Sequence, residues 1–362
     1  MLNVLYLINH AGKAGTEKYV YNLVQCYQGK RANCFFAYNE EGPLCERMQE
    51  MGIPMFRVPM KNPFDLGAAR RIAKICKEHK IDIIHTHYPR ENYVAVLSRL
   101  FYRKPQVIYT CHLTMETNFA WKITNKLITP HDKKIISVCN NGKELMVGNG
   151  VNPDKITVIF NGMPPIPAPE KSDQIRQELG IAPETFVVTT LSRYHFAKGL
   201  DYFVDSVAQL EKIAKRDYVV LFVGDGELYD QISKQIDERG LRHRIMQLGY
   251  RNDTDMILRG SDLFVNSAKC YEALSFAILE ALYHKLPVVA TNIGGNGDII
   301  NSETGCGKLV EYGDTAGMAQ AINSFMEDEV LYWTCSENAY KTVREVFDLD
   351  KLLDDVYQEY VK

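Results

Sequence analysis

The sequence lacks any long uninterrupted apolar run, although apolar residues make up 46% of its 362 positions. A membrane-spanning helix needs about 20 consecutive, mostly apolar residues, so we predict no transmembrane segment. Residues 1–8 also lack the basic leader and the small-residue cleavage site of a secretory signal. We therefore expect a cytoplasmic protein, and we predict that residues 2–8 form a β-strand.

The sequence also lacks any C-x-x-C pair, and its nine cysteines are scattered along the chain. This spacing argues against a disulfide framework and against a structural zinc site. We expect most of the cysteines to be small buried side chains in a reducing compartment.

No large excess of one charge marks the whole chain, because its net charge is only −3. The charges are nevertheless uneven: residues 1–165 carry 22 Lys and Arg against 13 Asp and Glu, and the remainder carries 20 against 32. A basic first half suits an anionic membrane surface or an acidic acceptor, but the same charges also suit ordinary solvated helix faces. Both interpretations stay open. We expect no nucleic-acid binding, because the chain has no recognised motif and its second half is acidic.

Two common nucleotide-binding fingerprints are missing as well. The loop at residues 9–18 contains Gly12 and Gly15 but matches neither G-x-G-x-x-G nor G-x-x-x-x-G-K-S/T. A glycine there lets a ligand approach the backbone, and free N–H groups at a helix start attract phosphate. A plain tight turn explains the same residues equally well. The missing fingerprint counts against a nicotinamide-dependent dehydrogenase.

Short apolar runs alternate with amphipathic patterns along both halves of the chain. This alternation predicts parallel sheets covered by helices on both faces. The expected helices include residues 16–28, 65–79 and 92–101. The expected strands are residues 2–8, 33–37, 55–58, 81–85, 107–111, 134–139 and 156–159, then 186–191, 218–223, 245–248, 263–266 and 288–290.

A linker is predicted at residues 161–169, where four prolines and a glycine exclude a helix or a central strand. The length suits two domains, which we place at residues 1–165 and 166–345. We expect the helix at residues 346–362 to pack back on the first domain. Ligands of open parallel sheets bind beyond the carboxyl ends of the strands, so the strand-end loops are the segments to examine.

Histidines occupy two of these loops. His85 and His87 have the spacing of residues on one face of a strand, which can indicate a metal site. No convincing third ligand lies nearby in the sequence, so we expect packing and hydrogen bonding at a sheet end instead. His112 is a candidate polar contact to a reacting group, although a half-buried, hydrogen-bonded histidine is the plainer interpretation.

Two cations, Arg193 and Lys198, bracket the loop after the strand at 186–191. Together with the N–H groups of a following helix they suit a diphosphate. Either cation alone would be an ordinary solvated charge.

The segment at residues 272–282 carries the most information. Its apolar residues predict a buried helix with Ser275 as the N-cap, which leaves the N–H groups of Phe276 and Ala277 available to an anion. Glu280 would lie inside this helix, where an ionised carboxylate needs a partner such as a hydroxyl-rich ligand. Glu272 precedes the cap and would reach another part of the ligand.

Taken in order, these motifs resemble glycosyltransferase family 4, a family of retaining enzymes with the GT-B fold. Its main signature, two Glu separated by seven residues, is matched by Glu272 and Glu280. Arg193 with Lys198, and the segments at 158–162, 223–228 and 285–295, match further parts of the family pattern. The ordered set covers nearly the whole chain. The resemblance implies an α/β chain with two doubly wound Rossmann-like parallel-sheet domains that face a central cleft, the first binding the acceptor and the second the donor.

The resemblance also implies roles for the matching residues. His112 would lie beside the anomeric carbon, Glu272 near the sugar hydroxyls, and Arg193 and Lys198 on the diphosphate, which makes these four the catalytic set. Glu280 would accept hydrogen bonds from the ribose. The implied donor-binding residues are Gly15, Arg193, Lys198, Asp225, Glu227, Tyr250, Arg251, Glu272, Ser275, Phe276, Ala277 and Glu280. No metal site and no cofactor are implied.

The implied function is retaining, metal-independent transfer of a hexosyl group from a nucleoside diphosphate sugar to a hydroxyl of a carbohydrate or lipid-linked acceptor. UDP-sugars are the first expectation and GDP-mannose the second, in cell-envelope polysaccharide or glycolipid synthesis. The basic first half then predicts peripheral contact with the anionic inner face of the cell membrane. The family usually has Gly-Phe-Gly before the signature helix, and the bulkier residues 273–277 predict a reshaped sugar pocket. A sugar-nucleotide epimerase and a non-catalytic binding module are the alternatives.

Overall fold

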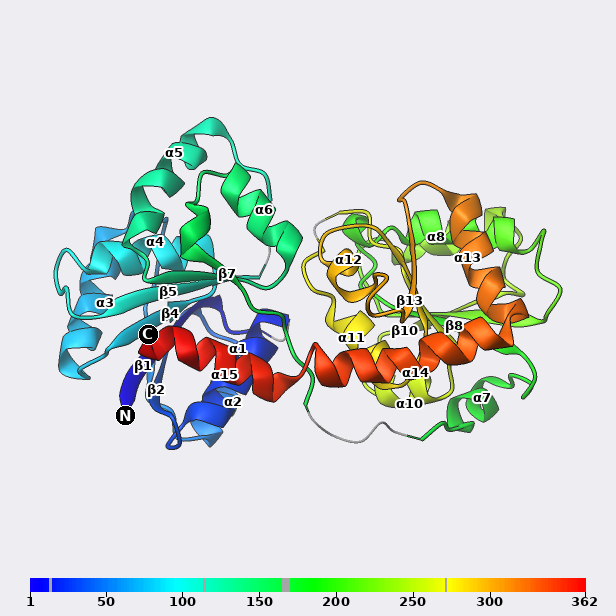
Figure 1. The fold of residues 1–362 in the computed structure, drawn as a ribbon, viewed down its shortest axis with the longest axis horizontal. Helices are drawn as coiled ribbons and strands as arrows, with labels where there is room; N and C mark the ends of the chain where they lie inside the picture. The colour runs from blue at the N-terminus through cyan, green and yellow to red at the C-terminus, as the bar shows by residue number, and fades with distance from the viewer. Residues whose placement is uncertain (13–14, 113–114, 165–169, 271) are drawn as a thin grey trace. The chain divides into compact units, whose positions relative to one another are not determined.

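The computed structural model describes residues 1–12, 15–112, 115–164, 170–270 and 272–362, which form two compact units (Figure 1). Unit 1 comprises residues 1–161 and 351–362, and unit 2 comprises residues 162–350. Lys13 and Ala14 of the first glycine loop and residues 165–169 of the proline-rich linker lie outside the described residues.

Unit 1 is built on a seven-stranded sheet in which all strand pairs are parallel. Its order is β3-β2-β1-β4-β5-β6-β7. The strands are β1 (Leu2–His10), β2 (Ala32–Glu40), β3 (Met55–Arg57), β4 (Ile83–Thr86), β5 (Gln106–Cys111), β6 (Lys134–Ser137) and β7 (Ile156–Val158). The helices are α1 (Gly15–Tyr27), α2 (Pro43–Glu50), α3 (Leu66–Glu78), α4 (Pro89–Ser98), α5 (Phe119–Ile128), α6 (Asn140–Gly148) and, from Lys351 onward, α15 (Leu349–Val361).

Alternation along the strands of unit 1 places helices on both faces of the sheet (Figure 1). Leu5 and Leu7 belong to the buried cluster that also contains residues of α3 and α4. Tyr6 points to the other face, where it accepts a hydrogen bond from the hydroxyl of Tyr360 in α15 at 3.4 Å. The C-terminal helix therefore completes the core of unit 1, and Lys133 binds the Tyr360 carbonyl at 2.9 Å.

Unit 2 has a six-stranded parallel sheet of order β10-β9-β8-β11-β12-β13. The strands are β8 (Phe186–Leu191), β9 (Tyr218–Val223), β10 (Ile245–Gly249), β11 (Leu263–Asn266), β12 (Val288–Thr291) and β13 (Gly307–Val310). The helices are α7 (Gln174–Leu179), α8 (Leu200–Leu210), α9 (Tyr229–Glu238), α10 (Thr254–Arg259), α11 (Phe276–Tyr283), α12 (Asn296–Ile299), α13 (Thr315–Glu327) and α14 (Glu329–Glu345).

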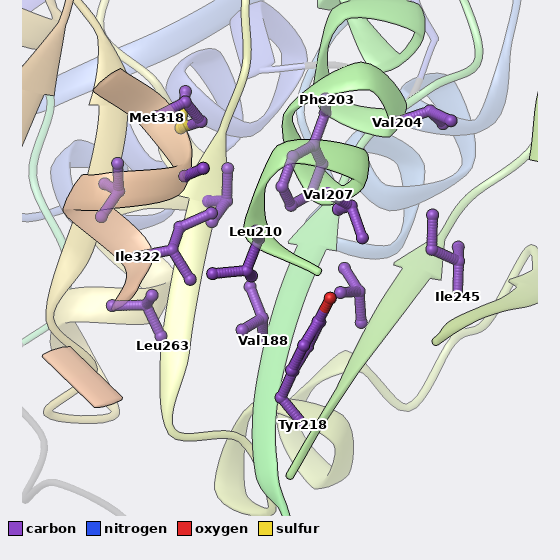
Figure 2. Close-up of a cluster of buried hydrophobic side chains, with 14 of the residues drawn as sticks. Val188, Phe203, Val204, Val207, Leu210, Tyr218, Ile245, Leu263, Met318 and Ile322 are labelled. Atoms are coloured by element: carbon purple, nitrogen blue, oxygen red, sulfur yellow. The ribbon is translucent and has the colours of Figure 1, made fainter. Parts of the chain in front are cut away.

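A buried apolar cluster packs one face of the sheet of unit 2 against helices (Figure 2). Val188 of β8 packs with residues of α8 and α13, among them Val207 and Ile322. Val187, its neighbour in the strand, belongs to the cluster on the opposite face with α7 and α10. The prediction of two Rossmann-like parallel-sheet domains is confirmed. Strand β13 was missed, because Gly307 and Lys308 dilute the apolar pattern of a short edge strand.

Both sheets reverse their strand order at one place, between β1 and β4 in unit 1 and between β8 and β11 in unit 2. Successive crossovers leave such a point in opposite directions, so the loops that follow these strands open a crevice. The loops after β1 and β4 in unit 1 and after β8 and β11 in unit 2 are therefore the candidate sites. Within the described parts of the chain, every helix is too short or too polar to span a bilayer.

Two carboxyl groups are buried in unit 1, that of Glu91 in the first turn of α4 and that of Asp132 before β6. Glu91 is fully buried, and neither of its carboxyl oxygens has a hydrogen-bond partner among the described residues. Asn92 donates to Asp132 at 3.0 Å. Burial raises the pKa of Glu91 to about 7 and the pKa of Asp132 to about 8, because an ionised carboxylate is poorly solvated there.

We expect Glu91→Gln to change the pH dependence of stability. Between the ordinary pKa of 4.5 and the folded pKa of about 7, the folded state binds one proton more than the unfolded chain, so the parent loses stability as pH rises. As pH rises through this range, the free energy of unfolding of the variant minus that of the parent should therefore increase by about 3 kcal/mol. Above pH 7 this difference should stay constant. Urea titrations at several pH values measure this, and a pH-independent difference would contradict it.

Candidate functional site

The crevice of unit 2 holds an ion pair between the two loops that flank the point of strand reversal. The loop after β8 carries Lys198, and the loop after β11 carries Glu272. The Lys198 ammonium donates to the Glu272 carboxylate at 2.6 Å. The Glu272 side chain is only 9% exposed and that of Lys198 is 34% exposed. The pair is therefore open to a ligand from the side of the lysine.

Arg193 precedes Lys198 in the same loop, and its side chain is exposed. Within the described residues the guanidinium has neither an ion pair nor a hydrogen bond with a side chain. Its peptide carbonyl accepts from His195 at 2.8 Å, which holds the turn. An exposed guanidinium without a carboxylate partner is suited to bind an anion in two-point fashion.

Helix α11 begins beside this pair. Ser275 is its N-cap, as predicted, and the hydroxyl accepts from the N–H of Ile278 at 3.5 Å and from Asn266 at 3.3 Å. The first helical residues, Phe276 and Ala277, are half-buried. Their N–H groups belong to the helix end that carries a partial positive charge. Glu280, one turn further, is half-buried rather than enclosed in the core.

Glycines allow the loops of this crevice to meet backbone to backbone. Gly199 has φ of +59°, and a Cβ there would lie 2.2 Å from the carbonyl oxygen of Ser267. Gly294 has φ of +60°, and a Cβ there would lie 1.7 Å from the carbonyl oxygen of Glu272. Only glycine combines this backbone conformation with such an approach. Both contacts fix the position of the loop that carries Glu272.

A buried polar network missed by the sequence analysis supports the same loops. Asn296 donates to Asn266 at 3.4 Å and to the Thr291 carbonyl at 3.0 Å. The Thr291 hydroxyl donates to the Ala268 carbonyl at 2.6 Å. Polar residues at the ends of two adjacent strands were the available signal. The network joins the ends of β11 and β12 to α12 and so positions the start of α11.

The remaining residues expected at the donor site lie at other strand ends of unit 2. Asp225 and Glu227 are exposed in the loop after β9, and Glu227 lies 3.6 Å from the His195 imidazole. Tyr250 is 71% exposed after β10. Its neighbour Arg251 is held by two carboxylates, Glu178 at 2.6 Å and Asp253 at 2.6 Å. The Arg251 guanidinium is thus engaged within unit 2, which the sequence did not indicate.

Three histidines lie side by side at the carboxyl ends of β4 and β5 in unit 1. His85 hydrogen-bonds Tyr360 at 2.6 Å and Thr110 at 2.7 Å, and His87 Nδ1 lies 3.2 Å from His112 Nε2. The prediction of packing and hydrogen bonding for His85 and His87 is therefore confirmed. No group of three His, Cys, Asp or Glu side chains suited to a metal ion occurs in the described ranges.

Burial keeps these imidazoles uncharged. It lowers the pKa of His112 to about 3, and burial together with the neighbouring His112 lowers the pKa of His85 to about 3. The pKa of His87 is also well below its ordinary value for the same reason. His112 is half-buried directly after the carboxyl end of β5, so it offers a neutral hydrogen-bonding group there. Gly15 is the first residue of α1, directly after the loop that follows β1, and it is half-buried.

A pocket of 510 Å³ lies under α5 in unit 1. Its walls include Tyr93 of α4, Tyr109 of β5, Trp121 of α5 and Met146 of α6. Asparagines line part of it, and Lys61 and Arg90 are the cations among the described residues of its lining. The pocket suits a ligand with an apolar part and an anionic part.

Comparison with known proteins matches each of the two units to a glycosyltransferase family model. Residues 14–165 match the family model "Glycosyltransferase Family 4", and residues 171–342 match "Glycosyl transferases group 1". An Escherichia coli UDP-Gal:alpha-D-GlcNAc-diphosphoundecaprenol alpha-1,3-galactosyltransferase is 29% identical, over 89% of this chain and 87% of its own. A Campylobacter jejuni N-acetylgalactosaminyltransferase, whose name gives a diphospho-undecaprenol acceptor, is 24% identical over 86% and 83% of the two chains.

Solved structures share the fold. HepE of Anabaena in complex with UDP has a TM-score of 0.86 at 21% identity, over 99% of both chains. A glycosyltransferase of Rickettsia africae has a TM-score of 0.87 at 23% identity, over 100% of this chain and 99% of its own.

We expect Gly294→Ala to disrupt the loop that carries Glu272. In the variant, an alanine must adopt the left-handed backbone conformation, and its Cβ overlaps the carbonyl oxygen of Glu272. The free energy of unfolding should therefore fall by about 3 kcal/mol or more. Gly240→Ala is the matched control, because Gly240 has φ of +67° with no atom within 4 Å of the added Cβ, and should lose only about 1 kcal/mol. Denaturant titration measures both, and equal losses would mean that the close contact is unimportant.

Proposed function

The chain belongs to glycosyltransferase family 4: residues 14–165 match the model of that family, and residues 171–342 match the model of glycosyl transferases group 1. We propose that it transfers a hexosyl group from a nucleoside diphosphate sugar to a hydroxyl of a lipid-linked or free carbohydrate acceptor. The transfer retains the anomeric configuration and needs no metal ion. A UDP-sugar is the favoured donor and a GDP-sugar the alternative. The acceptor belongs to cell-envelope polysaccharide or glycolipid synthesis, in keeping with the names of the similar enzymes.

The observation that carries this proposal is the charge arrangement in the crevice of unit 2. The exposed Arg193 guanidinium, the Lys198 ammonium and the N–H groups at the start of α11 all lie on loops that meet at the point of strand reversal. A departing nucleoside diphosphate gains negative charge as the glycosidic bond breaks. Fixed donors stabilise that charge, which is usually the largest contribution to catalysis. These groups take the part that a divalent metal plays in other transferases.

Glu272 has two functions in this scheme. Its carboxylate accepts a hydrogen bond from Lys198 at 2.6 Å and so holds the ammonium in place. It also accepts hydrogen bonds from the sugar hydroxyls of the donor. Glu280 binds the ribose. The leaving phosphate oxygen takes the proton of the attacking acceptor hydroxyl on the same face of the sugar, so the configuration is retained without a covalent enzyme intermediate.

Unit 1 supplies the acceptor side. His112 is neutral because its pKa is about 3, so it hydrogen-bonds a sugar hydroxyl without adding a positive charge beside a developing oxocarbenium ion. The pocket under α5 accommodates the lipid diphosphate of a lipid-linked acceptor, with the apolar chain on Tyr93 and Trp121 and the phosphates toward Lys61 and Arg90.

The first experiment is a thermal-shift panel of UDP- and GDP-sugars in the presence of EDTA. We expect one donor to raise the melting temperature and Arg193→Ala to weaken its binding roughly 10- to 100-fold, because charge-assisted hydrogen bonds contribute about 1.5–3 kcal/mol. Arg239→Ala is the matched control, since Arg239 is an exposed arginine of unit 2 that pairs with Asp205 at 2.8 Å.

The donor found in this panel is then incubated with acceptors. Formation of the product with an α-linkage from an α-donor, measured by the NMR coupling constant of the anomeric proton, supports retention. Donor binding without transfer to any acceptor would favour the binding module. Stabilisation only after a divalent metal is added would refute the metal-free mechanism.

A further inference from the structure

A pocket of 340 Å³ lies at the amino ends of the strands of unit 2. Its lining includes Phe186, the first residue of β8, with Arg216 before β9 and Asp262 before β11. The first turns of α14 contribute Tyr332 and Trp333. The candidate donor site lies at the carboxyl ends of the same strands. This amino-end pocket is therefore separate from the donor site, at the opposite edge of the sheet.

Two cations of the amino-end pocket share one carboxylate. The Arg176 side chain is only 9% exposed and binds Asp262 at 2.5 Å, and the Lys171 ammonium lies 3.7 Å from the same carboxylate. The Lys171 ammonium also donates to the Ser261 carbonyl. Loss of water around this ammonium lowers the pKa of Lys171; Asp262 opposes that shift, and Arg176 adds to it. The positive charge is thus only partly compensated, which favours an anion beside Lys171.

Arg216 is a second cation that an anion in this pocket can reach. Its side chain is exposed, and its guanidinium carbon lies 5.1 Å from the centroid of the Phe186 ring. The guanidinium donates to the Glu184 carbonyl at 3.3 Å and forms no ion pair with any described residue. Two carboxylates of the lining, Asp173 and Glu329, are exposed to solvent, where their charge is screened.

Aromatic side chains form much of the apolar wall of the pocket. The rings of Phe186 and Tyr332 meet edge to face with centroids 6.2 Å apart, and Tyr332 meets Trp333 in the same way at 5.1 Å. Trp333 is 60% exposed, so its indole ring is free to stack on a ligand. The Tyr332 hydroxyl has no hydrogen-bond partner within the described parts of the chain. Burial raises the pKa of this hydroxyl, so it stays a hydrogen-bond donor.

We propose that the amino-end pocket binds a nucleoside monophosphate, with the phosphate on Lys171 and Arg216 and the base against Trp333. A phosphate suits two neighbouring cations, and a flat base suits an exposed indole ring. The volume of 340 Å³ falls within the range of small-molecule sites, which begins at about 300 Å³. The inference does not depend on the proposed function, because the two sites lie at opposite edges of the sheet.

The test uses tryptophan fluorescence, because the chain has two tryptophans, Trp121 in unit 1 and Trp333 in the amino-end pocket. In a Trp121→Phe variant the signal comes from Trp333 alone. We expect AMP, GMP, CMP or UMP to change this signal to saturation. The matching nucleoside and inorganic phosphate should each bind at least about tenfold more weakly, because each lacks one of the two contacts.

Two substitutions test the contacts by isothermal titration calorimetry. Arg216→Ala should weaken nucleotide binding by about tenfold or more, since a charge-assisted hydrogen bond to the phosphate is lost. Trp333→Ala should weaken it at least about fivefold, since the stacking surface is lost. Arg239→Ala is the matched control, because Arg239 is an exposed arginine of unit 2 that pairs with Asp205 at 2.8 Å outside this pocket. It should bind like the parent.

Three results would overturn the proposal. The first is the absence of saturable binding by all four nucleotides. The second is binding of the nucleoside or of inorganic phosphate as tight as that of the nucleotide, because the base and the phosphate would then not both be recognised. The third is a parent that is dimeric in solution and becomes monomeric with Trp333→Ala, which would favour contact between copies at this surface.

Arg193→Ala separates this pocket from the candidate donor site, where nucleotides are also expected to bind. In the Trp121→Phe background it should weaken the donor-induced thermal shift and leave the fluorescence response to the nucleotide unchanged. Arg216→Ala should do the reverse, and its retained thermal shift also shows that it is folded. Loss of the fluorescence response in Arg193→Ala would assign the binding to the donor site and overturn the second site. Absence of the thermal shift in the parent would refute the donor assignment, and the fluorescence result would still decide the amino-end pocket.

Discussion

The close approach of backbone at the strand ends of unit 2 is the constraint on which the candidate donor site depends. Gly294 and Gly199 stand where any side chain would overlap a carbonyl oxygen of the neighbouring loop. The loops after β8, β11 and β12 are therefore held at fixed distances from one another. That spacing puts the Lys198 ammonium 2.6 Å from the Glu272 carboxylate and leaves Arg193 exposed beside them. The charges are thus held in fixed positions, which is the condition for strong electrostatic stabilisation.

The two units handle buried polar groups in opposite ways. In unit 1, burial removes charge, as the lowered pKa of His112 and the raised pKa of Glu91 show. In unit 2, carboxylates are paired with cations, as in Arg176 with Asp262 and Lys198 with Glu272. Neutral hydrogen-bonding groups suit an acceptor hydroxyl, and fixed charges suit a diphosphate.

Much of the fold followed from local patterns, because a strand buried on both faces must be apolar along its whole length. The predicted strands of both sheets and the Ser275 cap of α11 agree with the structure. Edge strand β13 was not predicted, because its half-buried positions Gly307 and Lys308 interrupt the apolar pattern. Helix α5 was not singled out, since its apolar residues face outward and no core pattern marks it. The support of the α11 loop by Asn266 and Asn296 depends on contacts between residues 30 apart, which no local pattern reveals.

The sequence by itself determined the fold class and the strand-end loops that carry Arg193, Lys198, Glu272 and Glu280, because apolar periodicity and motif order are local properties. Only the tertiary structure decided which charges are paired. Lys198 and Glu272 are 74 residues apart and meet through the strand order of the sheet, and Arg251 is occupied by Glu178 from α7. It also decided that the apolar residues of α5 remain exposed, because burial depends on which elements pack together and not on the composition of the helix.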